Sequence, residues 1–247
     1  MVEPVEIHNI TEIKAKNPTV IIGFPGTGLV GSVAASQLVD VLGMDFVGYI
    51  TSASFAPLAA IHNYKPLPPA RIHYSQKYNL VVILSEMSIP INSSMELAEK
   101  LFVFSKELNA SSIISLGGIS LKEEQNAVYV VASDQKMMKS VISKKLAKPI
   151  REGATTGVTG ILLSKGVLEK FPVLSILAEA SQDYLDPNAA SNALKVLSGV
   201  LGVEISTNQL EKDAKELETI KEAMIKSKTP RKTGSAGGDG DGGSMYG

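Results

Sequence analysis

Cysteine is absent from this chain of 247 residues. Its absence excludes disulfide bonds, thiol catalysis and thiolate-bound metals. Histidine is scarce as well: His8, His62 and His73 lie in different segments, without HxH or HExxH spacing. Because a metal centre needs several ligands at suitable spacing, the sequence predicts no metal site.

The chain also lacks a charge excess and any long apolar run. Its formal net charge is −1 and its pI about 6.3, so no global field attracts nucleic acid or a membrane surface. Lysines cluster only at 136–148 and after Lys226, without interleaved aromatic residues. No run approaches the ~18 apolar residues of a spanning helix, and three glutamates interrupt the N-terminal segment, which therefore does not resemble a signal sequence. We expect a soluble, cytoplasmic protein.

Apolar runs of strand character alternate with segments of helical periodicity. A β-branched run at 19–24 predicts a buried strand, and Leu29, Val33, Leu38 and Leu42 give residues 28–42 a helical pattern that ends at Gly43. The other expected strands are 45–51, the two limbs of a hairpin at 71–85, 111–118, 126–133 and 173–178. The other expected helices are 95–108 with Ser94 as its cap, Asp134 to about Ala147, and 187–201 after Asp186.

This alternation indicates the fold class. Strands that are apolar throughout and are separated by helices are typical of a mostly parallel sheet flanked by helices. We therefore predict an α/β domain over residues 1–206.

Two further segments follow that domain. Residues 207–226 are expected to form an amphipathic helix whose apolar stripe packs either on its own domain or on a second subunit. Residues 227–247 contain seven glycines, and none before Met245 is a sizeable apolar side chain. Such a segment cannot offset its ordering entropy, so we expect a flexible tail.

The segment 23–31, GFPGTGLVG, contains the GxGxxG pattern of dinucleotide-binding loops between a strand and a helix. Three features argue against phosphate binding: Pro25 removes an N–H from the turn, the strand 45–51 ends without an acidic residue, and no Lys follows Gly28. We interpret the glycines as serving a tight turn and close helix packing. The alternative is a nucleotide- or nucleoside-binding enzyme that uses this loop.

Other candidates for chemistry are isolated. Glu86 follows the strand 80–85, where active-site carboxylates often lie, but capping of the next segment explains it equally well. Gly117 and Gly118 end another strand and suit either a turn or the approach of a ligand. No acid, base and nucleophile can be assembled from these residues, so we expect no catalysis and no cofactor.

Four segments together resemble the archaeal proteasome assembly chaperone family, the PbaA/PbaB-like proteins. They are GFPGTGLVG at 23–31, the strand 80–85, GGIS at 117–120 and GVTGILLS at 157–164. The resemblance covers roughly residues 5–205. It implies a three-layer α/β fold related to nucleoside phosphorylases without their catalytic residues, symmetric homo-oligomers, and association with the α-ring of the proteasome core particle. A second family member is a further possible partner.

The same family directs attention to Met245, Tyr246 and Gly247. Proteasome assembly chaperones and activators commonly end in hydrophobic–Tyr–any residue, which inserts between adjacent α subunits, and this ending matches that motif at the C-terminus. We therefore expect a proteasome assembly chaperone or ATP-independent activator that docks through its tails. A scaffold whose tail binds another partner that recognises C-termini is a further hypothesis.

Overall fold

The structure is a computed structural model that describes residues 4–62, 64–121, 124–182 and 184–228. The chain divides into two compact units, Met1–Ala214 and Lys215–Gly247. Within the described residues, no helix combines the length and the apolarity that crossing a membrane requires.

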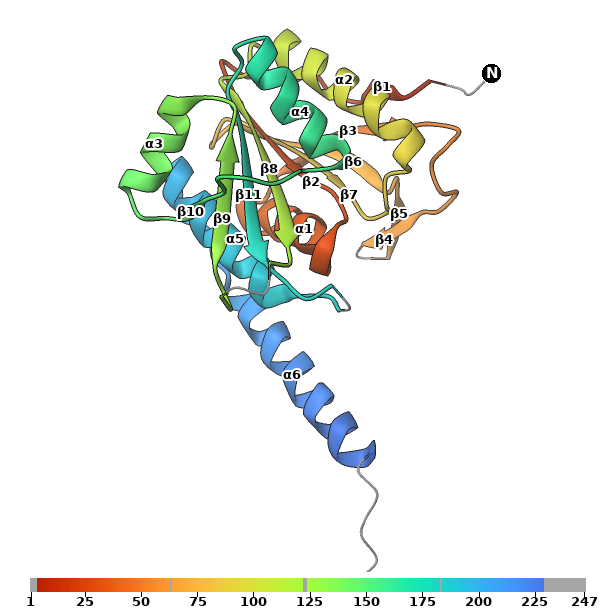
Figure 1. Cartoon of the computed structure of the whole chain (residues 1–247). Helices are drawn as coiled ribbons and strands as arrows, with labels where there is room; N and C mark the ends of the chain where they lie inside the picture. Colours follow the sequence, from red (N-terminus) through yellow and green to blue (C-terminus); the bar gives the residue numbers. More distant parts are fainter. Residues whose placement is uncertain (1–3, 63, 122–123, 183, 229–247) are drawn as a thin grey trace, which may run out of the picture. The chain divides into compact units, whose positions relative to one another are not determined.

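The first unit is built on one large mixed sheet (Figure 1). Its described strands follow the order β1-β3-β6-β7-β2-β8-β11-β9-β10. The four central neighbours β7, β2, β8 and β11 are parallel, whereas β1, β3 and β6 continue the sheet on one side as antiparallel strands. The strand bounds are β1 Glu6–Asn9, β2 Thr19–Gly23, β3 Asp45–Thr51, β6 Ala70–Ser75, β7 Leu80–Ser85, β8 Ser112–Ile119, β9 Val128–Ala132, β10 Lys148–Pro149 and β11 Val173–Glu179. A separate hairpin joins β4 (Ala60–His62) to β5 (Lys65–Leu67).

Helices cover both faces of this sheet. They are α1 (Val30–Leu42), α2 (Ile91–Glu107), α3 (Gln135–Ser143), α4 (Gly157–Leu168) and α5 (Pro187–Leu201). Alternate residues of β2 point to opposite faces: Ile21 packs in a core with α1 and α5, whereas Val20 and Ile22 pack with α2 and α4. Figure 1 shows α2 and α4 together on one side of the sheet. The predicted α/β class is confirmed, with the parallel strands in the middle.

Local chemistry sets several helix ends where the sequence predicts them. Gly43 adopts a left-handed conformation after α1, and the Asp134 and Asp186 side chains accept from the N–H groups of Met137 and Ala189 to cap α3 and α5. The last helix, α6 (Asn208–Lys228), starts directly after Thr207 as expected. In its first turn, Leu210 is buried in the core of the first unit.

Other expectations about the elements are wrong. Ser94 does not cap α2: the helix begins at Ile91, and the Ser94 hydroxyl donates to the Pro90 carbonyl at 3.2 Å. Leu29 lies outside the helix that was expected over 28–42, because α1 begins at Val30, and its side chain is exposed. The helix α3 ends four residues early, because Lys145 takes a positive φ and the chain then joins the sheet as β10.

Candidate functional site

The residues predicted to bind the proteasome, Met245, Tyr246 and Gly247, lie outside the described residues, so their role stays a prediction. The structure does place the glycine loop 23–31. It connects β2 to α1 through the short 3-10 turn η1 (Thr27–Leu29).

Close packing between backbones accounts for two glycines of this loop. A Cβ at Gly31 would lie 2.4 Å from the Phe24 carbonyl oxygen and 2.5 Å from that of Leu116, and one at Gly23 would lie 2.3 Å from the Gly31 oxygen. Gly28 adopts a φ of 62° inside the turn, which glycine tolerates best. These contacts agree with the structural interpretation, because they seat α1 directly against β2 and β8.

Gly31→Ala should therefore destabilise the protein strongly, by about 3 kcal/mol, because the new methyl group meets rigid backbone on two sides. Gly26→Ala is the matched control. Gly26 has an extended φ of −164°, and a Cβ there meets nothing within 4 Å. Chemical denaturation should show the control within about 0.5 kcal/mol of wild type. Equal stability of the two variants would contradict the packing explanation.

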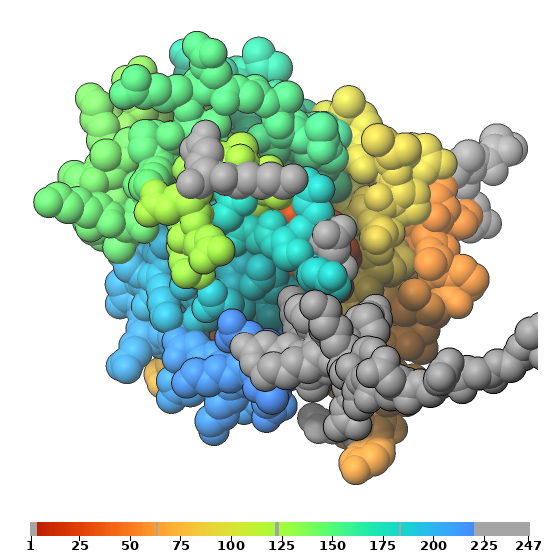
Figure 2. Space-filling model, turned by 60° about the horizontal axis from the view of Figure 1, so that its bottom comes forward, coloured from red at the N-terminus to blue at the C-terminus, as the bar shows by residue number. Residues whose placement is uncertain are grey.

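A pocket of ≈ 340 Å³ lies beside this loop at the carboxyl ends of the parallel strands. It is bounded by the segments 24–27, 88–94, 116–119 and 154–159 and by Leu177. Ligands of α/β sheets usually bind at this edge. Figure 2 brings the edge forward, and the red N-terminal segment is visible there deep between the yellow segment of α2 and the cyan segment around β11.

The pocket lies where α/β proteins commonly have their active site, but its described side chains are uncharged. Its described lining holds no Asp, Glu, His, Lys or Arg, so these side chains supply neither a general acid or base nor a cation for a polyphosphate. The pair Gly117-Gly118 lines it, and a Cβ at Gly118 would lie 2.1 Å from the Thr27 carbonyl oxygen. Gly118 therefore allows the strand β8 to approach the turn η1 closely.

Titration calorimetry with NAD, FAD or ATP should show no binding heat at micromolar concentrations. The reason is that the described lining of the pocket holds no cationic side chain, together with Pro25 in the loop and the missing acidic residue after β3. A one-to-one isotherm with any of the three would favour the nucleotide-binding alternative instead.

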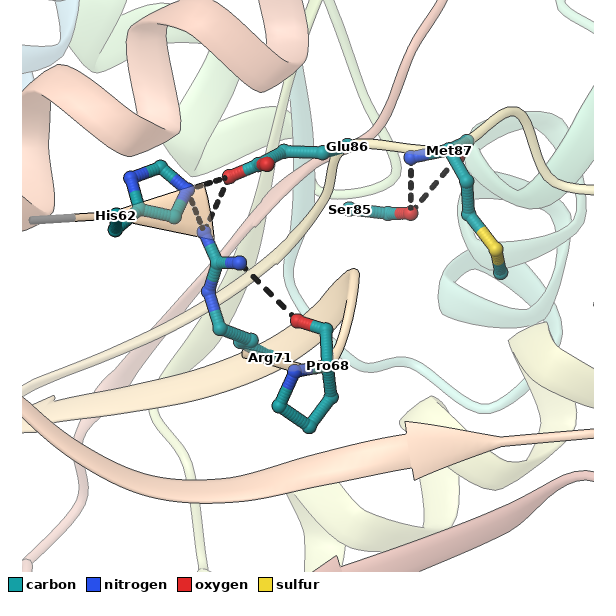
Figure 3. Close-up of polar contacts among 6 residues, drawn as sticks. All are labelled: His62, Pro68, Arg71, Ser85, Glu86 and Met87. Carbon is teal, nitrogen blue, oxygen red and sulfur yellow. Dashed lines mark hydrogen bonds and ion pairs between the residues drawn. The ribbon is translucent and has the colours of Figure 1, made fainter. Parts of the chain in front are cut away.

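A second group of polar side chains lies on the neighbouring strands (Figure 3). The Ser85 hydroxyl donates to the Met87 carbonyl at 2.8 Å and closes the turn that presents Glu86. One oxygen of Glu86 accepts from the Arg71 guanidinium and from His62 Nε2, which lies 2.6 Å away. Arg71 also donates to the Pro68 carbonyl at 3.1 Å.

Burial determines what this group does. The Arg71 side chain is 3% exposed, so its charge needs a partner, and Glu86 provides it. His62 lies on β4, so the same carboxylate also links the β4–β5 hairpin to the main sheet. Glu86 is thus the partner of a buried cation, neither a free carboxylate nor a simple cap. The sequence did not indicate this pairing, because its members are distant along the chain.

The histidines do not assemble a metal site within the described residues, in which no group of three or more suitable ligands occurs. His73 is buried, and its desolvation, helped by the nearby Arg71 charge, lowers the pKa of His73 to about 4. It is therefore uncharged at neutral pH. His8 lies on the edge strand β1, and its ring forms a hydrogen bond with the hydroxyl of Thr51 on β3.

Comparisons with known proteins place this fold. Residues 20–225 match the model described as the PAC2 family. PbaA of Pyrococcus furiosus, described as an archaeal homolog of proteasome-assembly chaperone, is 29% identical with a TM-score of 0.82, over 91% of this chain and 93% of that chain. PbaB of the same organism, described as an archaeal proteasome activator, is 25% identical with a TM-score of 0.80, over 90% of this chain and 99% of that chain.

A curated relative agrees with these structures. The uncharacterized protein MJ0106 of Methanocaldococcus jannaschii is 28% identical over 218 residues, which are 88% of this chain and 90% of that protein. The resemblance to archaeal proteasome assembly chaperones expected from the sequence is confirmed. Because the family match spans residues 20–225 and the folds agree over nearly their whole length, this protein belongs to the PAC2 family.

Proposed function

We propose that this protein assists the assembly of the proteasome core particle or activates it, without catalysing a reaction itself. The observation that carries this proposal is the likeness, over about nine-tenths of the chain, to PbaA and PbaB, one described as a chaperone homolog and the other as an activator. The pocket beside the loop 23–31 supports a non-enzymatic role, because its described lining residues include no acid–base group.

The proposed contact is the chain terminus Met245-Tyr246-Gly247. Met245 suits an irregular apolar slot, Tyr246 brings a large ring with a hydroxyl that needs a partner, and the terminal carboxylate can pair with a lysine of the α subunit. Burial of the Met side chain contributes roughly 1.5–3 kcal/mol and the ring a similar amount, before ordering opposes it. That sum is close to the ~4 kcal/mol of a millimolar affinity.

A single tail is therefore too weak to act alone. Several tails on one symmetric body raise the avidity by about 10²–10⁴ when they bind together. We propose a cytoplasmic homo-oligomer that docks on the α-ring through several tails, in which a second family member could replace some subunits.

Deletion of residues 227–247 tests this proposal. Full-length protein should retain mature or precursor core particles in a pull-down, and the truncated protein should retain neither. Light scattering should show the same oligomer for both proteins, because the deleted segment carries few apolar side chains. Retention by the truncated protein would refute docking through the tail, and a full-length monomer at micromolar concentration would refute the avidity argument. Binding of precursor particles alone would favour a chaperone over an activator.

A further inference from the structure

The pocket at the carboxyl ends of the parallel strands has properties that the proposed function does not use. Two helices, α2 and α4, begin at its wall, through Ser94 on the first and through Gly157, Val158 and Thr159 on the second. Helix N-termini carry partial positive charge and several N–H groups without a partner in the helix.

Among the described residues, these two N-termini have no capping side chain, and no acidic side chain in the first turn of their own helices. The N-cap residues Pro90 and Thr156 make no side-chain capping bond, and neither helix has an acidic residue in its first turn. By contrast, aspartates cap α3 and α5, whose residues are not among those that line the pocket. The first turns of α2 and α4 are thus left open where they meet the pocket.

A buried hydroxyl beneath the pocket provides an independent indication. Ser175 on β11 is fully buried, and its Oγ has no hydrogen-bond partner. It shares a face of the strand with Leu177, which lines the pocket, and it pairs in register with Ser115. The Ser115 hydroxyl contacts that of Thr159, a lining residue, at 2.7 Å. Most buried polar groups have a hydrogen-bond partner, so the Ser175 hydroxyl calls for an explanation, although it is not itself a lining residue.

The remaining lining limits what can bind. Phe24, Leu116 and Leu177 offer apolar surface, and the hydroxyls of Thr27 and Thr155 are available for hydrogen bonds. The part of the lining that the structure describes has no cationic side chain, so the two helix N-termini can balance about one negative charge. A cavity of ≈ 340 Å³ lies at the small end of the range for ligand pockets.

We propose that this pocket binds a small organic anion with one carboxylate or phosphate group, held between the N-termini of α2 and α4. Its apolar body lies against Phe24, Leu116 and Leu177. A nucleoside triphosphate does not fit this description, because its several charges would remain without a cation.

Thr156→Asp tests the proposal with inorganic phosphate and acetate as probes. The new carboxylate caps α4 and occupies the position of the anion, so the variant should be at least as stable as wild type without a probe. Wild-type protein should show a saturable rise in Tm with millimolar probe at constant ionic strength, and Thr156→Asp should bind the probes at least about tenfold more weakly. A larger effect of acetate would indicate a carboxylate ligand, and a larger effect of phosphate a phosphate ester.

Two further variants make the result specific. Asn109→Asp adds the same charge beyond the other end of α2 and should bind the probes like wild type. Gly26→Leu fills the pocket from a position with open space and an extended backbone, so it should fold normally and lose binding. No rise in the wild-type Tm, or an equal rise in wild type and Thr156→Asp, would overturn the proposal. Tyr246→Ala should bind the probes normally, which separates this site from the proposed docking of the tail.

Discussion

Tyr246→Ala should weaken binding to proteasome core particles by about a hundredfold or more. The change removes the ring and the hydroxyl proposed to enter the α-ring. A loss of ~1.5 kcal/mol per tail is about tenfold, and it multiplies over the tails that are engaged together. Binding of the oligomer to purified core particles, measured by surface plasmon resonance with the particle immobilised, would report the loss directly.

Two other changes at the same end separate the ring from the carboxylate. Deletion of Gly247 moves the terminal charge one residue inward, and residues appended after Gly247 move it away from its partner. Both should weaken binding while oligomer size and stability stay unchanged. Wild-type affinity of Tyr246→Ala would refute docking through this motif. Wild-type affinity of the extended protein alone would remove the carboxylate from the mechanism.

Glu86→Ala should lower the free energy of unfolding by about 3 kcal/mol, the size expected when a buried ion pair loses one partner. The Arg71 guanidinium would keep its bond to the Pro68 carbonyl but would lose its counter-charge while 3% exposed. His62 would lose the same carboxylate, so the β4–β5 hairpin should also be less protected from hydrogen exchange. Urea denaturation at constant protein concentration measures the first effect.

The double variant Glu86→Ala with Arg71→Met is the control for this pair. It removes the cation together with its partner, so the double variant should be more stable than Glu86→Ala alone. The surface ion pair of Lys106 with Glu169 offers a comparison. Glu169→Ala should lower the free energy of unfolding by no more than about 1 kcal/mol. A Glu86→Ala protein as stable as Glu169→Ala would show that Arg71 does not depend on Glu86.

Local signals in the sequence were sufficient where one residue type sets a boundary. Asp186 and Pro187 mark the start of α5, and Gly43 marks the end of α1, because capping and left-handed geometry depend on a few neighbouring residues. The strand β3 matches its predicted bounds for a similar reason, since its apolar run is bordered by polar residues.

Elements that depend on distant partners could not be predicted in this way. The helix α4 was missed as an element because it carries three glycines, which disfavour helices in isolation. In the fold, a Cβ at Gly166 would lie 2.7 Å from atoms of Ser133 and Val173, so glycine there serves packing against other segments. The short strand β10 exists only through pairing with β9.

The candidate sites divide in the same manner. The structural interpretation of the loop 23–31 could be argued from Pro25 and the missing acid, because both are visible in the sequence. The uncapped N-terminus of α4 could not be predicted from the sequence, because no helix was expected there. The pairing of Arg71 with Glu86 could not be predicted either, since a carboxylate after a strand does not reveal which cation it contacts in the fold.

The position of β2 in the sheet has a consequence for the order in which the chain folds. Its first residue, Thr19, pairs with Leu80 on one side and with Ser112 on the other, and β8 in turn pairs with β11. The strand β2 is thus synthesised well before β7 and β8, the two strands with which it pairs. Folding that depends on such non-local pairing is slow, and unpaired apolar strands aggregate readily. During translation, the strand 19–23 is therefore expected to need protection until β8, which ends at residue 119, has been made.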